Sequence, residues 1–386
     1  MRSSTPVDAA ATRGIRIACV IHSLDGGGAE RVMAALASRL SRRGHHVSLI
    51  TMGDGQGDRH TVDATVHRVN LGLLRPSHSR IAAVGNNLSR LRRLRAAIRA
   101  TRPDVVLSFC DRTNVLTLLA MLATRIPVIV SERSDPASQR MPATWEWLRR
   151  RLYRHAADVI VLTPAAANTV AAWLRQPATV IPSAVEPPPE THDESPLSAA
   201  DPGVQKRLIA VGRLESEKGF DRLLDAFAMI ADRFPDWELS IHGEGSLSDD
   251  LHHQRDRLGL AGRVRFPGWT RPIWPALAVA ELFVLPSRYE GFPSALLEAM
   301  AAGRACIAFD CPSGPAAIIR DGQDGLLVPA DDVAALAAAI ASCLADSDLR
   351  GRLGDQARSV IQRFGWEPMV DAYEARLIRA ATERNR

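Results

Sequence analysis

The sequence predicts an α/β fold with two Rossmann-like, doubly wound domains, each built on a parallel sheet. Three observations support this. Short apolar runs rich in β-branched residues alternate with helix-length segments along the 386 residues, which is the pattern of parallel strands covered by helices on both faces. The runs form two series. A stretch rich in proline and acid separates the series, so we expect two domains with separate cores.

The first series predicts a domain over residues 15–185. Its candidate strands are IRIACVIH (15–22), HVSLIT (46–51), DVVLSF (104–109), PVIVSE (127–132), DVIVLT (158–163) and ATVIPS (178–183). The preceding residues 1–14, MRSSTPVDAAATRG, lack the apolar core of a signal peptide, so we expect a disordered leader and a cytoplasmic protein.

The second series predicts a domain over residues 205–365, after an extended linker at 186–204. Its candidate strands are RLIAVG (207–212), WELSIHG (237–243), VRFPG (264–268), ELFVLPS (281–287), RACIAFD (304–310) and DGLLVP (324–329). The remaining residues, 366–386, predict a C-terminal helix that packs back on the first domain. Ligands of such sheets bind beyond the carboxyl ends of the strands, so we expect the site in a cleft between the domains.

Apolar content and cysteine usage exclude two classes of protein. The longest apolar run, residues 115–130, contains Arg125 and Pro127 and cannot span a bilayer, which excludes an integral membrane protein. The five cysteines form no Cys-x-x-Cys pair, so we expect small buried hydrophobic residues rather than disulfides or a zinc site. The acids at Asp346 and Asp348 have metal-binding spacing but predict a helix cap.

Charge is unevenly distributed between the two halves of the chain. Residues 1–185 hold 26 Arg and no Lys against 12 acids, a formal charge of +14, and residues 186–386 carry −9. Nucleic acid, an anionic bilayer or a plain solvated face could each account for the basic half. We favour a membrane surface at the inner face, without nucleic acid, because Trp145, Trp147 and Tyr153 lie beside Arg149, Arg150 and Arg151.

The stretch YEGFPSALLEAM, residues 289–300, places two carboxylates around a turn and a helix start. Gly291 and Pro293 exclude a continuous helix, so the helix should begin near Pro293 or Ser294 and end at Gly303. The N–H groups at a helix start bind phosphate readily. With an acid on each side, this segment fits a nucleotide sugar, which has a ribose diol, a diphosphate and sugar hydroxyls in sequence; a helix-dipole acid beside a solvated acid is the alternative.

Other candidate groups follow the predicted strands. A glycine loop, HSLDGGGAERV, comes after the first strand and includes Gly27 and Gly28; it matches no dinucleotide fingerprint. In VGRLESEKGF, Arg213 and Lys218 could neutralise a diphosphate leaving group. Further along lie two segments that could line a nucleobase site, with the residues Gly243, Glu244, Gly245 and Trp269; each could equally be structural.

Taken together, GGGAERV, VGRLESEKGF, HGEG, FPGW, SRYEGFPSALLEAMAAG and GPAAIIRDGQDGLLVP resemble glycosyltransferase family 4 in order and spacing, over nearly the whole chain. The resemblance implies a GT-B fold and retaining transfer of a sugar, without bound metal or other cofactor, from a nucleotide sugar, UDP being favoured. It is nearest to enzymes that build lipid-linked oligosaccharides or exopolysaccharides, which share a Ser-Glu-Arg stretch like that at Ser131, Glu132 and Arg133. A hexosyl or N-acetylhexosaminyl group would move to a glycan acceptor.

The resemblance also assigns roles to residues. Glu290 would contact the transferred sugar, Glu298 the ribose, and Arg213 and Lys218 the diphosphate. The remaining donor-binding residues would be Gly27, Gly28, Gly243, Glu244, Gly245, Trp269, Gly291, Phe292, Pro293, Ser294 and Ala295.

The group that takes the acceptor proton stays open. The departing phosphate, Glu132 and Asp111 are the candidates. Two other functions also stay open, namely a nucleotide-sugar epimerase on the same fold and a non-catalytic nucleotide-binding module.

Overall fold

The computed structural model describes residues 14–73, 80–139, 141–189 and 206–383. By their internal contacts these residues divide into two compact units. The first unit comprises Met1–Ser131, Ala143–Val159 and Ala372–Arg386, and the second comprises Glu132–Pro142 and Ile160–Asp371. The predicted leader falls almost wholly on residues outside the described ranges, and so does most of the predicted linker.

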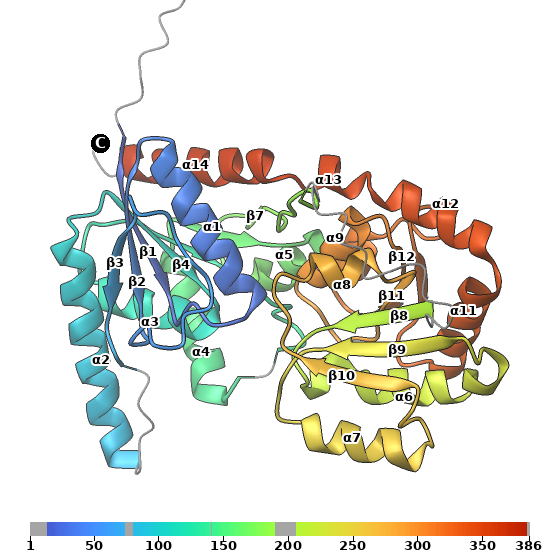
Figure 1. Ribbon diagram of the computed structural model, residues 1–386. Helices are drawn as coiled ribbons and strands as arrows, with labels where there is room; N and C mark the ends of the chain where they lie inside the picture. The colour runs from blue at the N-terminus through green and yellow to red at the C-terminus, as the bar shows by residue number, and fades with distance from the viewer. Residues whose placement is uncertain (1–13, 74–79, 140, 190–205, 384–386) are drawn as a thin grey trace, which may run out of the picture. The chain divides into compact units, whose positions relative to one another are not determined.

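A seven-stranded parallel sheet forms the N-terminal part of the described chain, in the order β3-β2-β1-β4-β5-β6-β7. Figure 1 labels β1, β2, β3 and β4 of this sheet. Its strands are β1 (Arg16–Ile21), β2 (His46–Thr51), β3 (His67–Asn70), β4 (Val105–Phe109), β5 (Val128–Ser131), β6 (Asp158–Val161) and β7 (Thr179–Val180). Five consecutive residues of β1 and all five of β4 are buried, because helices cover both faces of a doubly wound sheet.

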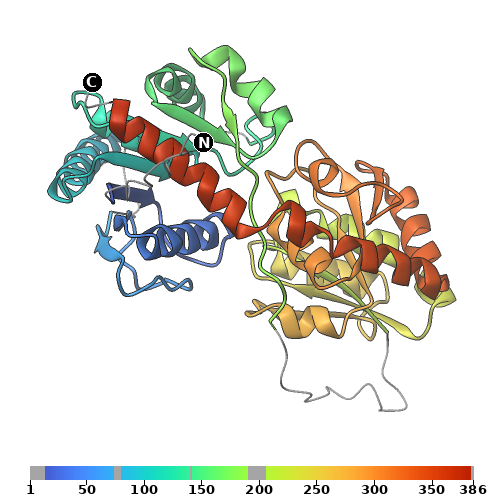
Figure 2. The same ribbon diagram turned by 90° about the horizontal axis from the view of Figure 1, so that it is seen from above.

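The helices that connect these strands are α1 (Gly28–Arg42), α2 (Arg80–Ala100), α3 (Asp111–Met121), α4 (Ala143–Leu152) and α5 (Pro164–Val170). The last described helix, α14 (Trp366–Glu383), contributes its residues from Ala372 onward to the first unit, where they run beside the strands and helices of that unit (Figure 2). The side chain of Tyr373 there lies 3.0 Å from the hydroxyl of Ser131, and Glu374 binds both Arg43 and His45.

The second sheet has six parallel strands in the order β10-β9-β8-β11-β12-β13. They are β8 (Lys206–Val211), β9 (Trp237–His242), β10 (Val264–Gly268), β11 (Leu282–Leu285), β12 (Ala305–Asp310) and β13 (Leu326–Pro329). The helices of this part are α6 (Phe220–Ala228), α7 (Ser248–Arg257), α8 (Trp274–Ala278), α9 (Ser294–Ala301), α10 (Pro315–Ile318), α11 (Val333–Ala345), α12 (Ser347–Ala357) and α13 (Val360–Arg363).

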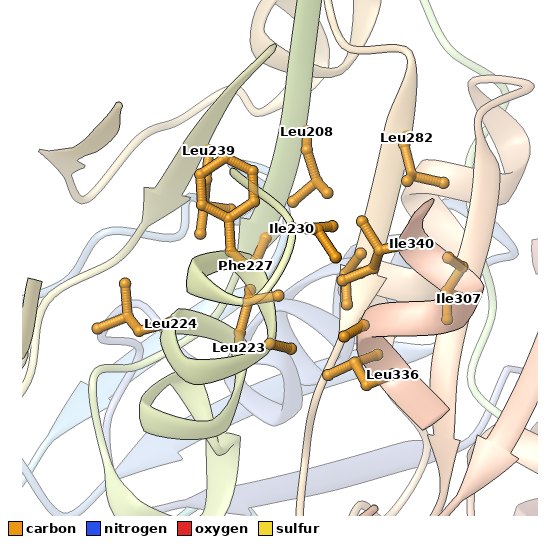
Figure 3. Close-up of a cluster of buried hydrophobic side chains, with 14 of the residues drawn as sticks. Leu208, Leu223, Leu224, Phe227, Ile230, Leu239, Leu282, Ile307, Leu336 and Ile340 are labelled. Carbon is orange, nitrogen blue, oxygen red and sulfur yellow. The ribbon is translucent and has the colours of Figure 1, made fainter. Parts of the chain in front are cut away.

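Alternate residues of these strands point to opposite faces, so each strand contributes to two cores. Leu208 and Ala210 belong to a cluster with side chains of α6 and α11; Figure 3 shows Phe227 and Ile340 of those helices against Leu208. Ile209, between them in sequence, belongs to a second cluster with side chains of α8 and α9. Two apolar faces of one sheet therefore fix the position of the loops that follow its strands.

The structure confirms the α/β class and all twelve predicted strands, and it adds one. β3, HRVN, is a four-residue edge strand without a fully buried residue, so it lacks the apolar run by which the others were predicted. The predicted helix start is also confirmed, because α9 begins at Ser294 and is followed by Gly303 with a φ of 70°. Asp346 caps α12 as predicted, through the backbone N–H of Leu349.

Two expectations about individual side chains are wrong. Four of the cysteines are buried, but Cys110 is only half-buried, since it ends the turn between β4 and α3 with a φ of 72°. The sequence predicted that Arg149 and Tyr153 lie on a membrane-facing surface, yet both are buried. Arg149 instead binds Glu146 of the same helix at 2.7 Å, and Tyr153 lies 3.1 Å from the amide of Asn114. None of the described helices combines the length and apolar character needed to cross a bilayer.

Candidate functional site

Two loops of the second unit meet at the carboxyl ends of β8 and β11. These strands are neighbours in the sheet, and the strand order runs in opposite directions from them, which is where ligands bind in doubly wound sheets. The backbone N–H of Arg288 donates to the carbonyl oxygen of Glu217 at 2.8 Å, and the guanidinium of Arg288 binds both oxygens of Asp221 at 2.9 and 2.6 Å. One loop therefore holds the other in place.

Glu290 is the buried carboxylate of this site. Its Oε1 accepts a hydrogen bond from the ammonium of Lys218 at 2.6 Å and another from the hydroxyl of Ser287 at 2.7 Å. Its side chain is 8% exposed and that of Lys218 is 19% exposed. A buried charge is stable only when it is paired, so in the absence of a ligand each of these two groups stabilises the other.

Lys218 depends on a glycine for its position. It ends a single turn of 3₁₀ helix, Ser216–Lys218, that closes at Gly219 with a φ of 65°. A Cβ atom on Gly219 would lie 2.0 Å from the carbonyl oxygen of Pro286. Only glycine tolerates both this φ and this approach without strain, and the contact brings the lysine loop against the segment that leads to Glu290.

Arg213 lies in the same loop and is largely open to solvent. Its side chain is 69% exposed and binds Glu217 at 2.7 Å. Glu215, between them, accepts hydrogen bonds from the backbone and hydroxyl of Ser246, which lower the pKa of Glu215. The loop therefore presents one exposed cation and one partly covered cation, each neutralised by a carboxylate.

The start of α9 offers backbone donors beside these cations. Pro293 is its N-cap, and no side chain caps the helix, so its first N–H groups can donate hydrogen bonds to an anion. Phe292 is buried and packs edge-on against Phe364 at 5.2 Å. Glu298 is half-buried, in the second turn of the helix. The five backbone positions from Gly291 to Ala295 thus form a fixed turn into the helix.

Gly291 also lies against another segment of the second unit. A Cβ atom there would come within 2.5 Å of the carbonyl oxygen of Arg133. The guanidinium of Arg133 in turn donates to the hydroxyl of Ser183 at 2.5 Å. The residues that follow β5 are therefore packed on the backbone next to Glu290.

The HGEG segment follows β9. Gly243 has a φ of 153°, and a Cβ atom on it would lie 1.8 Å from the carbonyl oxygen of Gly212. Gly245 approaches Leu214 in the same way, while Glu244 is exposed. The two glycines hold this segment against the loop of Arg213 and Lys218.

Beside this segment, His242 lies between Ser240 and Thr270, at 2.9 and 2.8 Å. Burial, together with the charge of Arg207, lowers its pKa to about 4, so the imidazole is neutral at physiological pH. It anchors Thr270, whose neighbour Trp269 is half-buried.

The glycine loop lies in the first unit. A Cβ atom on Gly27 would come within 2.2 Å of Oε2 of Glu30, so glycine here makes room for a carboxylate of the chain itself. Glu30 binds Nε2 of His22 at 2.9 Å. Neither His22 nor Glu30 was predicted from the sequence; the available signals were a histidine directly after the first strand and an acid in the first helical turn.

The two acids named as proton acceptors differ in exposure. Asp111 opens α3 and is half-buried; its Oδ1 accepts from the backbone N–H of Arg112 at 2.6 Å. Glu132 is completely buried, which weighs against direct contact with a solvated acceptor. Both assignments remain predictions.

The second unit thus brings together the Lys218–Glu290 pair, Arg213, the turn at Gly291 and the start of α9. Gly27, Gly28 and Asp111 belong to the first unit. Among the described residues, no group of three or more His, Cys, Asp or Glu side chains is arranged to hold a metal ion.

Comparison with known proteins gives matches to both halves of the chain. Residues 205–346 match the family described as "Glycosyl transferases group 1", and residues 27–184 match the "Glycosyl transferase 4-like domain".

Several relatives extend over most of the chain, and two of them are described here by name. The lipopolysaccharide core biosynthesis glycosyltransferase LpsE of Rhizobium meliloti is 28% identical over 350 residues, covering 90% of this chain and 94% of that protein. The GalNAc-α-(1→4)-GalNAc-α-(1→3)-diNAcBac-PP-undecaprenol α-1,4-N-acetyl-D-galactosaminyltransferase of Campylobacter jejuni is 27% identical over 352 residues, covering 91% and 94%.

Among solved structures, HepE of Anabaena in complex with UDP-glucose has a TM-score of 0.77 at 21% identity, covering 94% of this chain and 99% of that chain. At this level of identity the likeness shows a shared fold.

Proposed function

This chain belongs to glycosyltransferase family 4, with the GT-B fold, and from that premise we propose that it transfers a sugar from a UDP-sugar to a hydroxyl of a lipid-linked or cell-surface glycan. The chain is a glycosyltransferase of the kind that builds polysaccharides or their lipid-linked precursors. The UDP-glucose complex of HepE and the undecaprenol-linked substrate of the Campylobacter relative support the choice of donor and acceptor.

The observation that carries the proposal is the buried pair of Glu290 and Lys218. A carboxylate held by a lysine and by Ser287 accepts hydrogen bonds from sugar hydroxyls in a fixed direction. When the donor binds, the ammonium of Lys218 exchanges part of its contact with Glu290 for the diphosphate. Glu290 then contacts the transferred sugar, and Glu298, in the second turn of α9, contacts the ribose.

The site must above all stabilise the negative charge of the leaving diphosphate. As the bond between the sugar and the phosphate breaks, negative charge collects on the diphosphate. Arg213, Lys218 and the N–H groups at the start of α9 stabilise that charge more than they stabilise the intact donor. We propose that these groups act without a metal ion and that the anomeric carbon keeps its configuration.

Donor binding can be tested first. A nucleotide sugar at 100 times its dissociation constant stabilises the protein by about 2.7 kcal/mol, so a thermal-shift screen of UDP-, GDP- and dTDP-sugars should single out UDP-sugars. No stabilisation by any of them would contradict the proposal.

Transfer itself is tested with the nucleotide sugar that the thermal-shift screen identifies and with the lipid-linked glycan fraction of the source cells. We expect a glycosylated product whose new linkage keeps the donor's anomeric configuration, as read by nuclear magnetic resonance. Conversion of the donor sugar without any acceptor would indicate an epimerase instead. Activity should survive EDTA; a loss that magnesium or manganese restores would contradict metal independence.

A further inference from the structure

The loop that follows β10 is held by a polar side chain of the neighbouring strand. β10 is the edge strand beside β9, and its pairing shifts in register between Arg265 and Gly268. Gly268 has a φ of 81°, and its carbonyl oxygen accepts hydrogen bonds from the backbone N–H of Gly243 at 2.9 Å and from the hydroxyl of Thr270 at 3.3 Å. The loop of residues 269–273 therefore begins against the end of β9.

His242, the last residue of β9, bridges two hydroxyl groups. Its Nε2 lies 2.9 Å from the hydroxyl of Ser240, and its Nδ1 lies 2.8 Å from that of Thr270. The hydroxyl proton of Thr270 is directed at the carbonyl oxygen of Gly268, so Nδ1 carries the imidazole proton and donates to Thr270. Nε2 of the neutral ring then accepts from Ser240. One side chain thus ties the loop to its strand through hydrogen bonds of fixed direction.

This link is covered from solvent. Ser240 is 5% exposed and His242 is 8% exposed, and burial, together with the charge of Arg207, lowers the pKa of His242 to about 4. A neutral ring supplies the one donor and one acceptor that the two hydroxyls need, whereas an imidazolium would present two donors. A buried polar group costs free energy unless it is hydrogen-bonded, so an apolar residue would serve better at position 242 if it merely completed the core.

The groups around Glu290 indicate which end of the donor this loop meets. A Cβ atom on Gly314, in the loop after β12, would lie 3.0 Å from the Cβ atom of Glu290, so the carboxylate assigned to the transferred sugar lies on the side of β12. β9 and β10 lie on the opposite side, beyond β8. With the diphosphate between them, at Arg213 and Lys218, the nucleoside extends toward β9 and β10.

Further contacts support this direction. Gly243 packs on the carbonyl oxygen of Gly212, at the start of the loop that carries both cations. Ile273, at the end of the loop after β10, belongs to the same apolar cluster as Leu297 of α9, the helix assigned to the ribose. The half-buried indole of Trp269 lies in the same loop and offers a face on which a nucleobase can stack. The loop is thus placed beside the groups assigned to the rest of the nucleotide.

We propose that His242 is a positioning residue for the nucleobase of the donor: it fixes the loop of Trp269 and Thr270, and the fixed loop favours one base over the others. The base contacts the loop, and His242 acts through Thr270. This inference rests on the proposed function and goes beyond it, since it names the residue that sets the nucleotide preference.

Two substitutions at His242 separate the two hydrogen bonds of its ring. The side-chain amide of H242N lies near the position of Nδ1 and can still donate to Thr270, whereas the longer side chain of H242Q places its amide near Nε2, beside Ser240. T270V removes the far end of the bond without changing His242. The matched control is H252Q, which changes a half-buried histidine of α7 whose Nδ1 bonds to the carbonyl oxygen of Ser248.

Titration calorimetry measures affinity for UDP, ADP, GDP and inorganic pyrophosphate, which has no base. H242Q and T270V should bind UDP at least about tenfold more weakly, the usual scale for losing a buried hydrogen bond, and the parental preference for UDP over ADP and GDP should shrink. Affinity for pyrophosphate should stay parental, because Arg213 and Lys218 are unchanged. H242N and H252Q should bind all four ligands like the parent.

Kinetics and unfolding give a second readout. With the nucleotide sugar from the thermal-shift screen, H242Q and T270V should raise KM for the donor while kcat changes much less, because the groups at the reacting bond stay in place. A side chain that merely supported the core would lower the free energy of unfolding without changing the ratio of UDP to ADP affinity. If H242Q unfolds, T270V still decides, since Thr270 is a half-buried loop residue.

Three outcomes would overturn the inference: parental UDP preference in both H242Q and T270V, equal losses of UDP and pyrophosphate affinity in these variants, or an H242N variant as impaired as H242Q. A parent chain that binds none of the nucleotides is a different result, because it contradicts the proposed function itself.

Discussion

At the scale of single residues, substitutions at Glu290 and Glu298 should affect different parts of the donor, the transferred sugar and the nucleotide respectively. Glu290 is buried against Lys218, so the near-isosteric E290Q tests its charge without leaving a cavity. We expect E290Q to lower the rate of transfer and to leave affinity for free UDP nearly unchanged, because UDP carries no transferred sugar. E298Q should weaken UDP and the UDP-sugar alike. Titration calorimetry with both ligands measures this, and equal UDP affinity in both variants and the parent would contradict the assignment.

The two cations should each contribute to turnover. R213A and K218A should each reduce kcat by about 10²-fold or more, the usual effect of removing one preorganised donor that stabilises developing charge. K218A also leaves Glu290 without its ammonium partner, so this variant should lose stability as well. R213A removes a side chain that is 69% exposed and should unfold like the parent. Steady-state kinetics and thermal unfolding distinguish the two, and wild-type turnover in either variant would argue against a role at the diphosphate.

At the scale of elements, the loop that ends in Gly219 determines whether Lys218 meets Glu290. Alanine at Gly219 meets both an unfavourable φ, which costs about 1–2 kcal/mol, and the carbonyl oxygen of Pro286. We expect G219A to lose more than this in unfolding free energy and to lose most of its turnover. Gly259 is a matched control, since its φ is 72° but no atom lies within 4 Å of a Cβ there.

G259A should therefore show only the cost of the strained φ and keep its activity. Equal stability and equal activity of G219A and G259A would contradict the claim that the close approach of Gly219 to Pro286 positions the loop of Lys218. Chemical denaturation and transfer rates provide the comparison.

At the scale of the whole molecule, the charge of +14 over residues 1–185 against −9 over the rest predicts attraction of the basic part to anionic lipid. Each basic residue near such a leaflet contributes about 1 kcal/mol within a Debye length. Helix α4 contributes exposed groups to this surface: Trp147 is 57% exposed, and Arg150 and Arg151 are exposed, with Arg151 lying over the Trp147 ring.

Sedimentation with vesicles tests this surface. Binding should rise with the anionic lipid fraction, fall with salt, and drop in the triple variant W147S/R150S/R151S. Arg149 stays unchanged because it is buried. The control R257S/R352S removes two exposed arginines of the second unit and should bind like the parent. If binding did not change with the anionic lipid fraction, with salt or in the triple variant, the proposed attraction to an anionic membrane would be wrong.

The sequence by itself determined the class of fold and the kind of chemistry. Apolar runs fixed twelve strands because burial on both faces leaves a strong signal in composition, and Pro293 fixed the start of α9 because proline suits only the first turn. The edge strand β3 was not predicted, because its half-exposed and exposed residues give little of that apolar signal.

Only the tertiary structure decided which distant groups meet. The pairing of Lys218 with Glu290, the close approach of Gly27 to Glu30 and the burial of Arg149 depend on contacts that form inside each unit only when it folds. Spacing along a chain does not encode such contacts, because the direction and packing of each side chain are set by the neighbours that the fold assembles around it.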